Sequence, residues 1–296
     1  MLLVVDYSSL LYRAWFSMPE TMPAHAVHGF LNMLARVIGD RRPRTLAVAV
    51  DDDWRPAFRV EAIPSYKAHR VEDVAEAGEE ESDVEPIEAQ EALGREVLAA
   101  LGIAVLGVDG YEADDVIATL VRRATGRVEI LSGDRDLFAL VRDPDVAVLY
   151  PRRGTSELTV VDEGEIAARF GIPGRAYGDY ALLRGDPSDG LPGVRGIGEK
   201  TAAKLIRAHG SLDAVLAADD LAPGIARKLD AGRDYLERAR RVIPPVATLA
   251  LPPTPLAIPA APHDPAGLLD LATRHELLGA LERLDKAMRQ ALGEPR

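Results

Sequence analysis

Residues 2–6 read LLVVD, and three later segments share this apolar character: LAVAVD at 46–51, IAVLGV at 103–108 and VEILS at 128–132. Short apolar runs of this kind are typical of strands buried on both faces of a parallel sheet. Helix-patterned sequence lies between them, at 27–38 (VHGFLNMLARVI), in the residues leading to Leu101, and at 114–124 (DDVIATLVRRA). This alternation predicts an α/β fold, with a parallel, mixed-edge central sheet and helices on both faces.

The second half of the chain follows a different pattern. After a hairpin expected near 148–161, short helices separated by glycines replace the strands. Residues 244–265 hold eight of the 21 prolines, which predicts an extended connection, and 267–292 return to amphipathic helix. We therefore expect an α/β core at 1–165 and a helical region at 166–296, with the last helices packing back on the core.

The composition of the 296 residues excludes several classes of protein. No run of 18 apolar residues occurs, and the chain starts in a strand-like segment without the basic flank of a signal peptide, so we expect a cytoplasmic protein that does not contact membranes. The absence of cysteine excludes disulfides, cysteine-bound zinc, iron–sulfur clusters and thiol catalysis. Any metal must be held by oxygen or by one of the six histidines.

The net charge of −12 is unevenly distributed. Residues 71–91 contain ten acidic residues and no Lys or Arg, which leaves 37 acidic residues against 35 basic ones elsewhere. We interpret this run as a solvated, mobile face. The acidic total is therefore compatible with a DNA-binding surface on the rest of the molecule.

Carboxylates follow the four predicted strands. Because the carboxyl ends of parallel strands meet at one edge of a sheet, these side chains should converge there. Like charges so close repel by several kcal/mol unless a cation neutralises them, and oxygen ligands without Cys or His favour Mg²⁺ or Mn²⁺. Two such ions support in-line phosphodiester hydrolysis. The acids in question are Asp6, Asp51, Glu112, Asp114, Asp115, Asp134 and Asp136.

Each acid also has a simpler interpretation. Asp6 is of a type common at turns and helix caps, the three acids at 112–115 suit a helix N-terminus, and the two in SGDRDL suit a loop. The conjunction of acids after four successive strands favours the metal site.

A basic segment, FRVEAIPSYKAHR at 58–70, lies between the second strand and the acidic run. Its Lys and Arg residues suit phosphate groups, and its tyrosine suits stacking on an unpaired base. An ordinary charged surface loop is the alternative. The residues concerned are Arg59, Tyr66, Lys67 and Arg70.

A glycine-rich segment, GDPSDGLPGVRGIGEKTAAKL, occupies 185–205. It is not a nucleotide-binding P-loop, because Glu199 separates the last glycine from the lysine. The part at 191–206 predicts two short helices joined by a glycine hairpin that binds DNA without sequence preference. In this hairpin Gly196 and Gly198 allow close approach to a phosphate, and Lys200 and Lys204 add positive charge.

Several of these motifs together resemble those of the 5'-3' exonuclease and flap endonuclease family, especially the N-terminal nuclease domain of bacterial DNA polymerase I. The resemblance runs in order from Leu2 to His209 through VVDYSSLLYRAWF, YKAHR, GYEADDVIATL, LSGDRDLFAL and GDPSDGLPGVRGIGEKTA. No polymerase domain follows, so we expect a stand-alone nuclease.

The resemblance implies a PIN-like nuclease core, a helical arch at about 60–92 and a helix-hairpin-helix at about 190–209 that grips duplex DNA. It implies two or more Mg²⁺ or Mn²⁺ ions, and K⁺ held by hairpin carbonyls. Lys67 and Arg70 would contact the scissile phosphate as catalytic groups, with Tyr66 and Arg59 as further substrate contacts. The implied metal ligands are Asp6, Asp51, Glu112, Asp114, Asp115, Asp134, Asp136, Asp186 and Asp189.

Three features depart from the family pattern. Tyr7 stands where the family usually has Gly, and Gly190 where it usually has Asn. The arch is also unusually acidic, which should weaken threading of a single-stranded flap.

The function expected from these features is a structure-specific 5' nuclease, exonuclease and flap endonuclease, that acts as a monomer on DNA with a 5' end or flap during replication or repair. A two- or three-metal-ion mechanism would cut the phosphodiester. One alternative is a DNA-junction binding module with weak catalysis. Another is a small-molecule phosphatase using Asp51 and Asp53 as a D-x-D pair, which leaves the glycine-rich segment unexplained.

Overall fold

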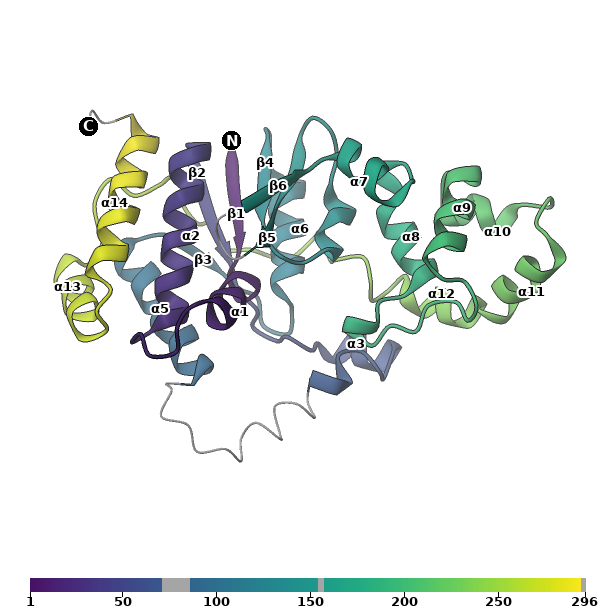
Figure 1. Cartoon of the computed structure of the whole chain (residues 1–296), viewed down its shortest axis with the longest axis horizontal. Coiled ribbons are helices and arrows are strands. Elements are labelled where there is room, and N and C mark those ends of the chain that lie inside the picture. Colours follow the sequence, from purple (N-terminus) through teal and green to yellow (C-terminus); the bar gives the residue numbers. More distant parts are fainter. Residues whose placement is uncertain (71–85, 154–156, 294–296) are drawn as a thin grey trace.

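The computed structural model describes residues 1–70, 86–153 and 157–293 (Figure 1). A six-stranded sheet lies at its centre, in the order β3-β2-β1-β4-β5-β6. All neighbouring strands are parallel except β5 and β6, which form an antiparallel hairpin. The strands are β1 (Leu2–Asp6), β2 (Thr45–Ala49), β3 (Ala104–Leu106), β4 (Val128–Leu131), β5 (Val146–Arg153) and β6 (Glu157–Val161).

This sheet confirms the predicted fold class, including the mixed edge. β1 lies in the middle, with Val4 paired to Ala47 of β2 on one side and to Ile130 of β4 on the other. Its side chains are buried on both faces, as the uninterrupted apolar run predicts.

Helices cover both faces of the sheet and continue beyond it. They are α1 (Tyr7–Ser17), α2 (His25–Arg41), α3 (Ala57–Ala62), α5 (Ile87–Leu101), α6 (Ala113–Arg123), α7 (Glu163–Phe170), α8 (Tyr177–Arg184), α9 (Glu199–His209), α10 (Leu212–Ala217), α11 (Pro223–Ala231), α12 (Arg233–Ala239), α13 (Pro265–Arg274) and α14 (Leu278–Leu292), with 3₁₀ turns η1 (Asp136–Leu140), η2 (Gly174–Ala176) and η3 (Pro187–Asp189). No helix in the described residues is both long and apolar enough to cross a membrane.

Alternate residues of β1 separate two hydrophobic cores. Leu3 and Val5 belong to the core that includes residues of α1, α2, α5, α13 and α14, whereas Leu2 and Val4 belong to the core that includes residues of α6 and of α7 to α12. The helices α7 to α12 extend away from the sheet on the side opposite α13 and α14 (Figure 1). One continuous core therefore joins the α6 face of the sheet to the helical region.

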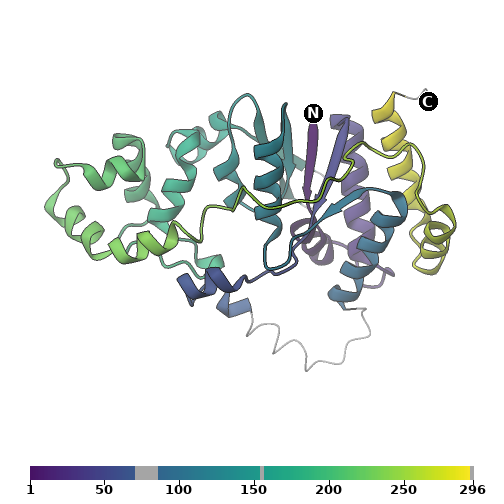
Figure 2. The ribbon, with the colours of Figure 1, turned by 180° about the vertical axis from the view of Figure 1, so that it is seen from behind.

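The proline-rich segment is extended, as predicted, and crosses the back of the molecule to reach α13 (Figure 2). It follows α6, where Arg123 Nη2 donates to Leu249 O at 2.6 Å, and reaches β2 where Leu46 N donates to Leu256 O at 2.7 Å. The prolines keep this segment out of a helix, so its backbone groups have no helical partners. Some of its carbonyls are hydrogen-bonded to the core instead.

Two helix predictions need correction. The amphipathic stretch at 267–292 is broken into α13 and α14 at residues 275–277, where Glu276 adopts a left-handed φ of 56°. Within 191–206 only α9 is helical, so the hairpin joins α9 to α8, which lies upstream of the predicted pair. Residues 71–85 of the predicted arch at 60–92 lie outside the described residues, and the acidic run ends inside α5, where Gln90 is buried.

Tyr7, one departure from the family pattern, connects α1 to α5. Its hydroxyl donates to Glu91 O at 2.8 Å, and its ring meets Phe30 edge to face at 4.9 Å. A Cβ at Gly94 would lie 2.0 Å from the Tyr7 hydroxyl oxygen. The large side chain at position 7 therefore fits because α5 has a glycine opposite it.

Glu129 is a fully buried carboxylate on β4. Arg41, at the end of α2, donates through Nε at 2.7 Å and through a second guanidinium nitrogen, and Arg127 adds a contact at 3.1 Å. We expect Arg41→Met to lower the free energy of unfolding by about 3 kcal/mol, because it leaves a buried charge largely unpaired. Urea denaturation measures this change.

The exposed pair of Arg274 and Asp270 on α13 is the matched control, and Arg274→Met should cost less than about 0.5 kcal/mol. Combining Arg41→Met with Glu129→Leu should recover most of the lost stability, since the uncompensated charge is gone. Equal losses for Arg41→Met and Arg274→Met would contradict this account.

Candidate metal centre

The strand-end acids lie at the carboxyl edge of the sheet. Asp6 is the last residue of β1 and caps α1, accepting from Ser9 N at 3.2 Å and from Ser132 Oγ at 2.5 Å. Asp51 follows β2 and accepts from Ala113 N, at the start of α6, at 2.9 Å. The side chains of neighbouring strands are therefore linked to one another at this edge, as the parallel topology predicts.

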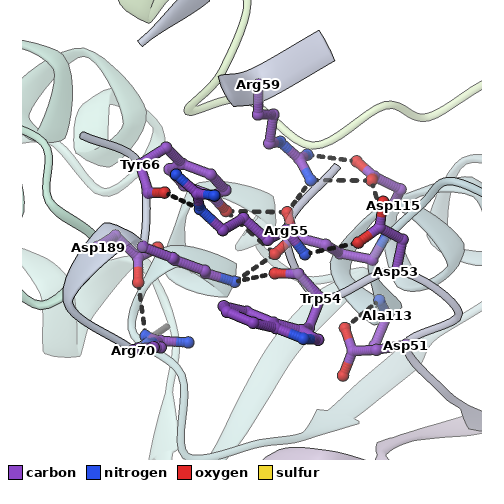
Figure 3. A network of polar contacts seen from close by, with 12 residues as sticks. Asp51, Asp53, Trp54, Arg55, Arg59, Tyr66, Arg70, Ala113, Asp115 and Asp189 are labelled. Carbon is purple, nitrogen blue, oxygen red and sulfur yellow. Dashed lines mark hydrogen bonds and ion pairs between the residues drawn. The ribbon is translucent and has the colours of Figure 1, made fainter. Parts of the chain in front are cut away.

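Glu112 and Asp115, at the N-terminus of α6, are neutralised by residues of the basic segment (Figure 3). Arg59 forms ion pairs with both, donating through Nη2 to Asp115 Oδ1 at 2.6 Å. Tyr66 donates its hydroxyl to Glu112 at 2.8 Å, and the Lys67 ammonium pairs with the same carboxylate. Asp115 also accepts from Val246 N at 2.7 Å, which ties the proline-rich segment to this cluster.

Three predicted site residues are buried and bonded within the protein. Arg59 and Tyr66 are 2% and 5% exposed, and their polar groups are bonded to Asp115 and Glu112. Asp115 has no exposed surface, and both its oxygens are bonded to protein groups. The reason is that α3 packs its Arg59 face against α6, whereas the sequence pattern suggested a surface loop.

A second group of acids lacks such neutralisation. Burial, with Asp51 and Asp134 nearby, raises the pKa of Asp6 to about 7. The pKa values of Asp114, Asp134 and Asp136 are also raised, first by burial and then by neighbouring carboxylates. A divalent cation would relieve this repulsion, and hard oxygen donors of this kind suit Mg²⁺ or Mn²⁺.

The loop between α8 and α9 brings in the last two predicted ligands. Asp189 accepts from Arg70 Nη2 at 2.7 Å, and Asp186 accepts from Arg184 Nη2 at 2.8 Å. Asp189 of η3 lines one small pocket with Asp114 of α6 and Asp136 of η1. In the part of the chain that the structure describes, no three acidic or histidine side chains converge on a single point suited to a metal ion.

Gly190 holds this loop against the basic segment. Its φ is +68°, a Cβ would lie 1.9 Å from Ser65 O, and its own carbonyl accepts from Ser65 Oγ at 2.7 Å. Next to this contact Lys67 adopts a left-handed φ of 48° and donates its backbone N–H to Asp189 O at 2.9 Å. The second departure from the family pattern thus reflects a backbone approach too close for any side chain.

The glycine hairpin precedes α9, and its predicted DNA-binding residues are exposed. Gly196 has a φ of +81°, and Gly198 caps α9 with open space around its Cα. Lys200 and Lys204 lie in α9. Lys228 of α11 donates to Gly196 O at 2.9 Å, so one hairpin carbonyl already has a cationic partner.

Sequence reasoning missed three neighbours of the site. Ser132, in the same SGD motif as Asp134, binds Asp6, and its place directly after a strand was the available signal. Trp54 follows the DDD run at 51–53, and its carbonyl accepts from Lys67 Nζ at 3.3 Å. No sequence pattern near Lys228 indicates its role, because Lys228 reaches the hairpin from a helix further along the chain. Asp53, the second acid of the phosphatase alternative, accepts from Arg55 N at 2.9 Å in its own loop.

Comparisons with known proteins agree with this geometry. Residues 1–171 match the family model of the 5'-3' exonuclease N-terminal resolvase-like domain, and residues 172–264 match that of the 5'-3' exonuclease C-terminal SAM fold. A 5'-3' exonuclease of Streptomyces coelicolor is 47% identical over 95% of this chain and 98% of its own length. DNA polymerase I of Mycobacterium tuberculosis is 39% identical over 89% of this chain, which corresponds to 29% of the polymerase.

Two solved structures share the fold. A bacteriophage T5 flap endonuclease in complex with DNA and metal ions has a TM-score of 0.67 at 20% identity, covering 99% of this chain and 98% of that one. The catalytic core of Rad2 with a DNA substrate has a TM-score of 0.59 at 15% identity, covering 98% and 92%. With two family models matched in order and a curated relative similar over nearly its whole length, the chain belongs to the 5'-3' exonuclease family.

Proposed function

We propose that this chain is a divalent-metal-dependent, structure-specific 5' nuclease that hydrolyses DNA phosphodiesters at a 5' end or at the base of a 5' flap. The observation that carries this proposal is the division of charge at the sheet edge. Glu112 and Asp115 have basic partners, whereas burial and the charge of Asp134 raise the pKa values of Asp6, Asp114 and Asp136. A cluster that lacks cations and adjoins phosphate-binding groups fits metal-assisted phosphoryl transfer.

The proposed metal ligands are Asp6, Asp51, Glu112, Asp114, Asp134, Asp136, Asp186 and Asp189. Bound Mg²⁺ or Mn²⁺ would activate the attacking water and offset charge on the leaving oxygen. Because no three of the described side chains share a focus suited to a metal, we infer that several of them turn toward the cation on binding. The proposal needs one copy of the chain, since all these residues come from it, and we place the activity in the cytoplasm.

Lys67 and Arg70 are the proposed phosphate contacts. Both are held by carboxylates, Lys67 by Glu112 and Arg70 by Asp189. Once cations take over these carboxylates, the two basic groups are free to bind the scissile phosphate and stabilise its developing charge. The exposed hairpin and α9 would hold the adjoining duplex through its phosphates.

At the hairpin we propose a lysine in place of the K⁺ ion that the resemblance implies. The Lys228 ammonium already binds Gly196 O, within a helix anchored by buried Leu229. A Cβ at Gly232 would lie 2.9 Å from Val194 Cγ1, so the end of this helix packs directly on the hairpin. We infer that Lys228 supplies the charge that a monovalent ion would otherwise bring.

The first test is cleavage of an end-labelled 5'-flap DNA in Mg²⁺ or Mn²⁺, with products resolved by gel. We expect cuts at the flap junction or release of short 5' products, lost with a chelator and lowered at least about 100-fold by Asp136→Asn. Asp219→Asn, an exposed substitution between α10 and α11, is the matched control and should leave the rate unchanged.

Thermal unfolding provides a second measurement of the same site. Mn²⁺ should raise the melting temperature of the native protein by about 5 °C, because binding to the folded state alone stabilises it. Asp136→Asn should be at least as stable as the native protein in chelator, since one repelling charge is removed, and should gain less from Mn²⁺. DNA that is bound but left intact under all conditions would instead identify a junction-binding module.

The roles of Lys67 and Arg59 can be separated experimentally. Lys67→Met should slow flap cleavage about 100-fold while changing the free energy of unfolding by less than about 1 kcal/mol, because Glu112 keeps Arg59 and Tyr66. Arg59→Met should cost about 3–5 kcal/mol of stability, because it leaves two buried carboxylates short of a partner. Urea denaturation and single-turnover cleavage measure the two effects, and a stable Arg59→Met protein would refute the structural role.

The monovalent-ion dependence of DNA binding tests the role of Lys228. The native protein should bind duplex DNA with the same affinity in KCl and in LiCl of equal ionic strength, measured by fluorescence anisotropy. Lys228→Met should bind about fivefold more weakly in LiCl and recover partly in KCl, and Lys228→Arg should resemble the native protein. A native protein that needs K⁺ for tight binding would show that Lys228 does not replace the ion. Arg227→Met, one position earlier in α11, controls for the loss of a nearby charge.

A further inference from the structure

Trp54 lies in a loop that is fixed at several points. The backbone N–H groups of Asp52 and Asp53 donate to Tyr111 O at 3.3 and 3.2 Å. Arg55, the next residue after Trp54, donates through Nε to Tyr66 O at 2.7 Å. The loop between β2 and α3 is therefore held on both sides of Trp54, which fixes the backbone that carries the indole.

The indole itself has no comparable partner. It is 41% exposed, and no aromatic contact, cation–π contact or hydrogen bond from its ring nitrogen occurs within the described ranges of the chain. The only other tryptophan, Trp15, is half-buried and packs on His25 with 4.5 Å between ring centres. A large aromatic side chain on a rigid loop with its ring left exposed is typical of a binding surface.

The surroundings of Trp54 indicate what would bind there. Its carbonyl accepts from the ammonium of Lys67, the proposed contact of the scissile phosphate. Figure 3 shows Trp54 within the same network of polar contacts as Arg55, Tyr66 and Asp189. A nucleotide whose phosphate reached Lys67 would thus have its base near the indole.

The sequence pattern pointed to Tyr66 as the aromatic group that stacks on an unpaired base. In the structure Tyr66 is 5% exposed and its hydroxyl is bonded to Glu112, so its ring has little surface open to a base. The ring packs beside Lys67, whose ammonium lies 5.2 Å from the ring centre. Trp54 is an exposed aromatic residue whose backbone carbonyl accepts from the same ammonium.

We propose that the Trp54 indole is a stacking platform for an unpaired base of the DNA substrate, next to the phosphate bound by Lys67. This inference rests on the proposed nuclease function and specifies a base-binding site for it. Stacking on an exposed aromatic ring tolerates every base, which suits an enzyme that recognises DNA structure and not sequence. The site would favour substrates with an unpaired nucleotide beside the cut over fully paired ends.

The presence of only two tryptophans allows a direct test in the full chain. Trp15→Phe leaves Trp54 as the sole tryptophan, and Trp54→Phe leaves Trp15 as the matched control. Each variant is titrated with 5'-flap DNA in Ca²⁺, with binding followed by anisotropy of a label at the distant end and a gel confirming intact DNA. We expect flap DNA to quench Trp54 fluorescence and to leave Trp15 fluorescence unchanged. A blunt duplex should bind without quenching Trp54.

Affinity provides an independent measurement. Trp54→Ala should weaken binding of the flap DNA about tenfold and binding of the blunt duplex less than twofold, since base stacking on one aromatic ring has an effect of this size. Trp54→Tyr should restore most of the flap affinity, because its ring also stacks. A purely structural role for Trp54 would weaken both substrates equally.

The outcomes separate this inference from the proposed function. Flap DNA that binds with unchanged Trp54 fluorescence, or a blunt duplex that quenches it equally, overturns the stacking site and leaves the nuclease proposal intact. Failure of the native protein to bind either DNA overturns both. Quenching specific to the flap, together with the selective affinity loss in Trp54→Ala, establishes the site.

Discussion

Electrostatic repulsion among carboxylates is the constraint around which this molecule is arranged. Parallel strands end at a common edge, so acids that follow several strands are brought together whatever their distance in sequence. The fold relieves part of this repulsion internally, through Arg59 and Lys67 at Glu112 and Asp115. The repulsion among the other strand-end acids is not relieved in this way, which is the condition under which a surface attracts divalent cations.

The neutralised carboxylates, Glu112 and Asp115, and their basic partners also hold the tertiary structure together. Arg59 connects α3 to α6 and donates through Nε to Val242 O at 3.1 Å. Asp115 accepts from Val246 N of the proline-rich segment, which then continues to β2 and the final helices. A single buried ion-pair cluster therefore links elements from the start, middle and end of the chain. Within this cluster we expect substitution of Arg59 or Asp115 to affect folding before catalysis.

The sequence was sufficient to predict the strands, their alternation with helices, and the edge of the sheet at which the acids lie. These depend on local apolar runs and on the geometry of parallel sheets, both readable from one chain. The burial of Arg59 and Tyr66 was not predictable, because α3 is short and its burial depends on α6 and on residues near Val242. The place of Tyr7 depends likewise on Gly94, a contact across the fold that no local pattern reveals.

The close contact between the loop after α8 and the basic segment couples the two parts of the protein. Gly190 approaches Ser65 without room for a side chain, and Asp189 O fixes the backbone of Lys67 in a left-handed conformation that few non-glycine residues adopt. Strain of this kind persists only where the surroundings enforce it. Because the same loop leads directly into the hairpin and α9, a duplex held there would be fixed in position relative to Lys67. In the proposed nuclease, the distance from the bound duplex to the cut would thus be set by covalent continuity and by these two backbone contacts.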